Sequence, residues 1–88
     1  MDATMERRQR SKLNVDLELL CRRYHDGLPI AEVADLVEAR GFNREAVEGI
    51  YTGRQGRAND QIGPRTWLTM TWYRLEESGR YELVAYAS

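Results

Sequence analysis

Few side chains in this 88-residue sequence are suited to catalysis or metal binding. Cys21 is the single cysteine and His25 the single histidine. Cys21 falls on an apolar helical stripe, as a buried side chain does, and His25 falls at its end, where a helix dipole favours a cation. One cysteine and one histidine do not complete a zinc site, and no carboxylate run has calcium-loop spacing. Because no nucleophile is patterned with a base and an orienting group, we expect no enzyme, no metal, no cofactor and no small-molecule substrate.

Arginine and asparagine side chains in the middle of the chain are suited to a different task. Arginine binds phosphates and base edges through paired hydrogen bonds, and asparagine binds base edges in the same way. The local charge also changes sign here. Residues 30–50 contain five acidic and two basic residues, whereas residues 51–66 contain three arginines and one aspartate.

The composition bounds the class of protein. A chain of 88 residues has room for one hydrophobic core, and 42% hydrophobic with 31% charged residues is ordinary for a folded domain. The net charge of −1 lacks the basic excess that is typical of nucleic-acid binders. No stretch approaches eighteen apolar residues, and the first residues have no apolar segment of a signal peptide. We therefore expect a cytoplasmic protein that does not insert into a membrane.

The apolar spacing predicts three helices that follow a flexible basic arm over residues 1–10. The first helix, at about 12–26, has the apolar stripe of an amphipathic helix. Pro29 suits the first turn of a second helix, at about 29–40, and Gly41 ends it. Asn43 is a favourable N-cap for a third helix, at about 43–52, with Phe42 packing on Val47 as a hydrophobic staple. Residues 11–88 are then a single domain.

The rest of the chain reads as a surface loop and a β-hairpin. Residues 53–64 hold three glycines and a proline with almost nothing apolar, which predicts a loop. Residues 66–75 and 80–87 are rich in threonine, aromatic and β-branched residues, and the turn between them contains Gly79. The predicted fold class is α+β, with three helices followed by a two-stranded antiparallel hairpin.

Residues 29–54 together with the hairpin resemble a helix-turn-helix of the winged-helix type. The resemblance lies in Ile30, Val33 and Ala34 on the first helix, the glycine at the turn, the capping asparagine, and Val47 and Ile50 inside the second helix. A winged helix places a β-hairpin after its recognition helix, in the order found here. The resemblance implies a dimeric transcriptional regulator that binds double-stranded DNA. The DNA-binding residues it implies are Asn43, Arg44, Thr52, Arg54, Gln55, Arg57 and Asn59.

An alternative hypothesis is a small protein-binding inhibitor or adaptor of phage or plasmid type, for example one that inhibits a bacterial defence complex. Glu45 and Glu48 would face the phosphates of bound DNA, which they repel. Both faces of the predicted hairpin are apolar, so its second face is covered either by another protein chain, which can be a second copy, or by the first helix and the arm. The predicted protein-interface residues are Trp67, Tyr73, Glu76, Glu77 and Tyr86.

Overall fold

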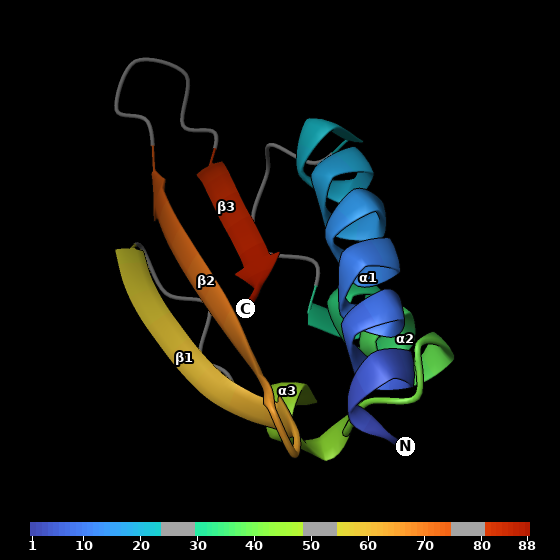
Figure 1. Cartoon of the computed structure of the whole chain (residues 1–88). Helices are drawn as coiled ribbons and strands as arrows, with labels where there is room; N and C mark the ends of the chain where they lie inside the picture. Colours follow the sequence, from blue (N-terminus) through green and yellow to red (C-terminus); the bar gives the residue numbers. More distant parts are fainter. Residues whose placement is uncertain (24–29, 49–54, 75–80) are drawn as a thin grey trace.

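The computed structural model of the chain describes residues 1–23, 30–48, 55–74 and 81–88. Within these residues three helices precede a three-stranded antiparallel sheet (Figure 1). The elements are α1 (Ala3–Arg23), α2 (Ile30–Ala39), α3 (Glu45–Glu48), β1 (Gln55–Gly63), β2 (Thr66–Arg74) and β3 (Tyr81–Ala87). The predicted α+β fold, with three helices followed by a hairpin, is confirmed, and the sheet has one strand more than predicted.

Helix α1 begins at Ala3, so the prediction of a flexible arm over residues 1–10 is wrong for most of that segment. Asp2 caps the helix, because its Oδ1 accepts a hydrogen bond of 2.7 Å from the backbone N–H of Met5. Glu6 in the first turn is completely buried. The N-terminal arginines therefore lie on an ordered helix that packs against the rest of the fold.

The turn between α2 and α3 follows the predicted signals. Gly41 has a φ of 83°, and the N–H groups of Gly41 and Phe42 donate to the carbonyls of Glu38 and Val37, which is a Schellman cap. Asn43 then caps α3, since its Oδ1 accepts a hydrogen bond of 3.0 Å from the N–H of Glu45. The chain thus leaves one helix and enters the next within a few residues.

Strand β1 occupies most of the segment predicted to be a loop, and that prediction is wrong for residues 55–63. It pairs antiparallel with β2 from Gln55 opposite Tyr73 to Gly63 opposite Thr66, with a register shift between Gln61 and Gly63. The strand is polar and glycine-rich, so it lacks the apolar alternation from which a strand is recognised. Residues 55–63 form a strand because they pair with the apolar strand β2.

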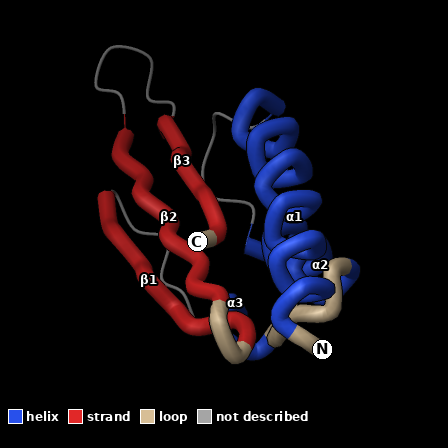
Figure 2. Tube along the Cα trace, viewed as in Figure 1, coloured by secondary structure: helices blue, strands red, loops and turns tan. Residues whose placement is uncertain are grey.

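The helices pack on one face of the sheet, and the core lies between them (Figure 2). Strand β2 alternates, with Leu68, Met70 and Trp72 pointing into this core. The helices contribute Leu13, Leu17, Leu20, Val33, Ala34, Val37 and Val47, the turn between α2 and α3 contributes Phe42, and the outer strands contribute Ile62 and Ala87. Among the described helices, none is long and apolar enough to cross a membrane.

Polar contacts fix α1 against its neighbours. Arg40 makes a two-pronged ion pair with Asp16 at 2.7 and 3.1 Å, which joins the end of α2 to α1. The side-chain amide of Asn14 pairs with the backbone of Ala87, accepting from its N–H at 2.7 Å and donating to its carbonyl at 2.9 Å. Helix α1 is therefore tied both to α2 and to the edge strand β3.

Candidate functional site

The face of the sheet turned away from the helices carries exposed aromatic side chains. In β2, the residues that alternate with the buried Leu68, Met70 and Trp72 are Trp67, Thr69, Thr71 and Tyr73. The strand register places Asn59 and Tyr86 on either side of Thr69, and Arg57 and Val84 on either side of Thr71. We call this surface the outer sheet face. Its described members are Arg57, Asn59, Gln61, Trp67, Thr69, Thr71, Tyr73, Val84 and Tyr86.

Four large hydrophobic side chains of the outer sheet face are substantially exposed. The exposed fractions are 41% for Trp67, 43% for Tyr73, 53% for Val84 and 47% for Tyr86. A water-facing sheet face is normally polar, with the apolar residues alternating toward the core. The aromatic groups here therefore form an apolar surface that the described helices leave uncovered.

The centre of this face is well packed. Thr69 is only 6% exposed although it points away from the core, because its neighbours on β1 and β3 surround it. Its hydroxyl donates a hydrogen bond of 3.1 Å to Oδ1 of Asn59. The middle strand of the outer sheet face is therefore held by strand pairing on both of its sides.

The side chains of Asn43 and Arg44 make hydrogen bonds to nearby residues of the chain. Asn43 uses its side-chain oxygen to cap α3. The guanidinium of Arg44 donates to Asp35 and, at 2.6 Å, to Glu48. The hydrogen bonds that Arg44 donates to Asp35 and then to Glu48 raise the pKa of Arg44 above its usual value. The positive charge of Arg44 is thus compensated by two carboxylates before any phosphate approaches.

The other predicted DNA-binding residues fall in three groups. Thr52 and Arg54 lie outside the described residues, and of Gln55 only the backbone is described, paired with Tyr73. Arg57 and Asn59 lie on the outer sheet face. Of the predicted DNA-binding residues, Arg57 and Asn59 therefore share a surface with the described protein-interface residues.

Three of the five predicted protein-interface residues are described, and all three lie on the outer sheet face. Trp67, Tyr73 and Tyr86 come from two strands and share one side of the sheet. Glu76 and Glu77 lie outside the described residues. The first helix covers the opposite face of the hairpin, so it does not cover these aromatic groups.

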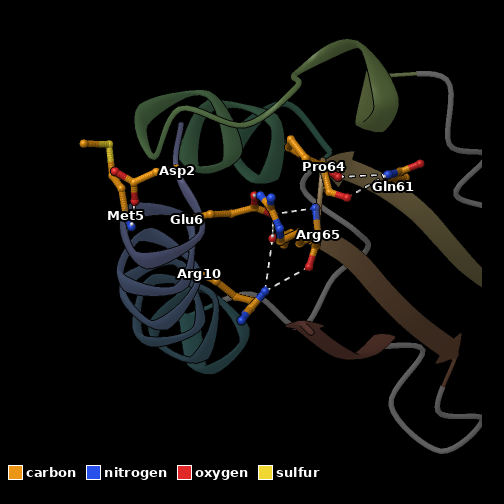
Figure 3. Close-up of polar contacts among 9 residues, drawn as sticks. Asp2, Met5, Glu6, Arg10, Gln61, Pro64 and Arg65 are labelled. Atoms are coloured by element: carbon orange, nitrogen blue, oxygen red, sulfur yellow. Dashed lines mark hydrogen bonds and ion pairs between the residues drawn. The ribbon is translucent and has the colours of Figure 1, made fainter.

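A polar cluster around Glu6 was not foreseen from the sequence. Glu6 accepts hydrogen bonds from the hydroxyl of Thr66 at 2.6 Å and from the backbone N–H of Arg65 at 2.7 Å. Figure 3 shows Glu6 and Arg10 reaching from α1 toward Arg65, whose carbonyl accepts a hydrogen bond from Arg10 at 2.9 Å. The hydrogen bond from Thr66 is the main cause that lowers the pKa of Glu6, although burial opposes it. A lone glutamate in a polar N-terminal segment carries no sequence signal of burial.

No family model, curated protein or solved structure matches this chain. Within the described residues, no three His, Cys, Asp or Glu side chains are grouped so that they could hold a metal ion.

Proposed function

We propose that this protein is a protein-binding module, an inhibitor or adaptor, that docks on its partner through the outer sheet face. The observation that carries the proposal is the exposure of Trp67, Tyr73, Val84 and Tyr86 on one side of one sheet. Aromatic side chains are enriched in protein interfaces and dominate their binding energy when a partner excludes water from them.

The composition of the outer sheet face supports this proposal. Beside its hydrophobic groups lie Asn59, Gln61 and Thr71, which can donate and accept hydrogen bonds at an interface. A standard interface buries about 800 Å² on each partner and combines an apolar centre with polar groups that find partners. Three strands of seven to nine residues each are of suitable size for such a contact.

Binding of double-stranded DNA is the second candidate function, and one observation favours it. Arg57 and Asn59 lie two residues apart on the same exposed side of β1. DNA affinity, however, depends on several cations that neutralise phosphates. Among the described members of the outer sheet face, Arg57 is the one cation, and just before α3 the charge of Arg44 is compensated by Asp35 and Glu48. The surface therefore suits a protein partner better.

The proposal is tested by capturing partners from a host lysate with three forms of the protein. The double variant Trp67→Ala with Tyr86→Ala removes two aromatic groups from the outer sheet face. The double variant Val15→Ala with Leu19→Ala removes exposed apolar groups of similar exposure from α1 and serves as the matched control. We expect a specific protein to be retained by the native form and the control and to be lost with the aromatic variant.

The same preparations are then incubated with random duplex DNA at low salt. Equal capture of the partner by all three forms would show that the outer sheet face does not bind the partner. Salt-sensitive DNA binding by the native form that a further variant, Arg57→Ala, abolishes would favour the regulator over the protein-binding module.

A further inference from the structure

Three arginines surround a hollow at the end of the molecule where α1 begins. The hollow measures about 380 Å³ and lies between the first two turns of α1 and the turn that joins β1 to β2. We call it the arginine pocket. The residues that line it are Ala3, Thr4, Glu6, Arg7, Arg10 and Arg65.

The single carboxylate of the arginine pocket leaves most of the arginine charge uncompensated. The two shortest hydrogen bonds to Glu6 come from neutral donors, the Thr66 hydroxyl and the Arg65 backbone N–H. The guanidinium of Arg65 forms a long ion pair with Glu6 at 3.5 Å, and the Arg65 side chain is 59% exposed to solvent. The charge of Arg65 is therefore available to an incoming anion.

Arg10 is held in place by acceptors that carry no charge. Its Nη1 donates to the Arg65 carbonyl at 2.9 Å and to the Thr66 hydroxyl at 3.3 Å (Figure 3). These contacts orient the guanidinium without neutralising it. Arg7 lines the same hollow from an exposed position on α1. Three arginines thus line one hollow that contains one buried carboxylate.

We infer that the arginine pocket binds an acidic side chain, a glutamate or aspartate, of the protein partner. This inference rests on the proposed function, since the partner is the protein that covers the outer sheet face. The arginine guanidinium matches a carboxylate through two parallel hydrogen bonds, which makes it a specific receptor for this group.

The position and charge of the pocket define the ligand further. Arg65 stands two residues before Trp67 of the outer sheet face, so a partner segment on that face needs to extend only a short way to reach the pocket. The three arginines exceed the one buried carboxylate in charge, so the pocket attracts an anion, and a protein partner on the outer sheet face offers a glutamate or aspartate. The pocket therefore suits the carboxylate of an acidic peptide segment.

The test is a titration of the full chain with hexaglutamate at low salt, followed by NMR of the backbone amides and the arginine side chains. We expect the largest shifts at Arg7, Arg10, Arg65 and Thr66. The variants Arg7→Gln and Arg65→Gln should each weaken hexaglutamate binding roughly two- to fivefold, the range of an exposed ion pair. Arg10 is left unchanged because it also holds the β1–β2 turn.

Arg8→Gln is the matched control, because Arg8 is exposed on the same turn of α1 and does not line the pocket. It removes the same charge, so it reports the general effect of net charge. Equal weakening by Arg8→Gln and Arg7→Gln would overturn the inference, as would the absence of shifts at the pocket. A preference for hexathymidylate over hexaglutamate would also overturn it in favour of nucleic acid.

The two pairs of variants test the acidic ligand and the protein-binding function separately, although the first rests on the second. If Trp67→Ala with Tyr86→Ala abolishes partner capture while Arg7→Gln with Arg65→Gln leaves both capture and hexaglutamate binding unchanged, the acidic ligand is wrong and the protein-binding function stands. If both pairs of variants capture the partner normally, the function itself fails.

Discussion

Gly56 of β1 lies opposite Trp72 of β2, and the indole ring of Trp72 fills the place where a side chain at position 56 would begin. A Cβ built on Gly56 would stand 2.4 Å from Cζ2 of Trp72, which is far closer than two carbon atoms approach. Trp72 is 4% exposed and belongs to the core. The glycine therefore permits the tryptophan to pack beneath a strand that is otherwise polar.

Gly56→Ala should destabilise the protein by about 1–3 kcal/mol, the usual range for overpacking a core. Chemical denaturation followed by circular dichroism measures the change. The double variant Gly56→Ala with Trp72→Leu should lose clearly less than the sum of the two single variants, because the smaller side chain makes room for the added methyl group. Additive losses would show that the two residues do not compete for space.

Glu6 should make the stability depend on pH in the acidic range. The pKa of Glu6 is lowered in the folded protein, chiefly by the hydrogen bond from Thr66. The stabilisation is therefore fully present above the pKa of an unfolded glutamate, about 4.3, and is lost as the pH falls through the lower folded value. Glu6→Gln should be less stable than the native form at pH 7, and the difference should shrink below about pH 4.

The control for this prediction is Glu18→Gln, which removes a carboxylate from an exposed pair on the same helix. Its effect at pH 7 should be small, because exposed ion pairs contribute little to stability. Thermal unfolding of the three proteins between pH 3 and pH 7 provides the measurement. A constant difference between native protein and Glu6→Gln across this range would contradict the assigned role of the Glu6 charge.

The sequence predicts the helix-capping residues of this fold better than it predicts its strands. Gly41 and Asn43 act through local backbone geometry, and both perform the predicted tasks. Strand β1 was missed because its pairing with β2 is a tertiary effect: among its residues, Ala58 and Ile62 alone are apolar. Local pattern carries little information about a strand whose partner supplies the apolar surface.

The sequence likewise indicates only part of the outer sheet face, because tertiary packing decides which face is exposed. The apolar residues on both faces of the hairpin indicated a second contact, but they could not tell which face the helices cover. The buried Glu6 and the arginine pocket depend on residues about sixty positions apart, Glu6 with Arg65 and Thr66. No local signal connects such residues, so only the folded structure brings them together.

Asn43→Ala should cost about 1 kcal/mol of folding free energy, because it removes the side-chain acceptor that caps α3. Asn43→Ser keeps a capping oxygen and should retain most of the stability. Denaturant unfolding of both variants distinguishes them. Equal losses of folding free energy in Asn43→Ala and Asn43→Ser would show that the capping oxygen does not stabilise the protein.

The two tryptophans should report the two faces of the sheet independently. Trp72 is 4% exposed in the core and Trp67 is 41% exposed on the outer sheet face. Trp72→Phe leaves Trp67 as the one indole, so its fluorescence should lie at longer wavelength and be strongly quenched by acrylamide. Trp67→Phe leaves Trp72, whose emission should lie at shorter wavelength and resist quenching.

Both spectra are recorded under native conditions, with circular dichroism confirming that each variant is folded. Equal quenching of the two variants would contradict the assignment of faces on which the proposed interface depends. Once a partner is in hand, its addition should protect Trp67 from acrylamide and leave Trp72 unchanged, because an interface on the outer sheet face excludes the quencher from that face alone. Unchanged quenching of Trp67 in the presence of the bound partner would instead place the partner elsewhere.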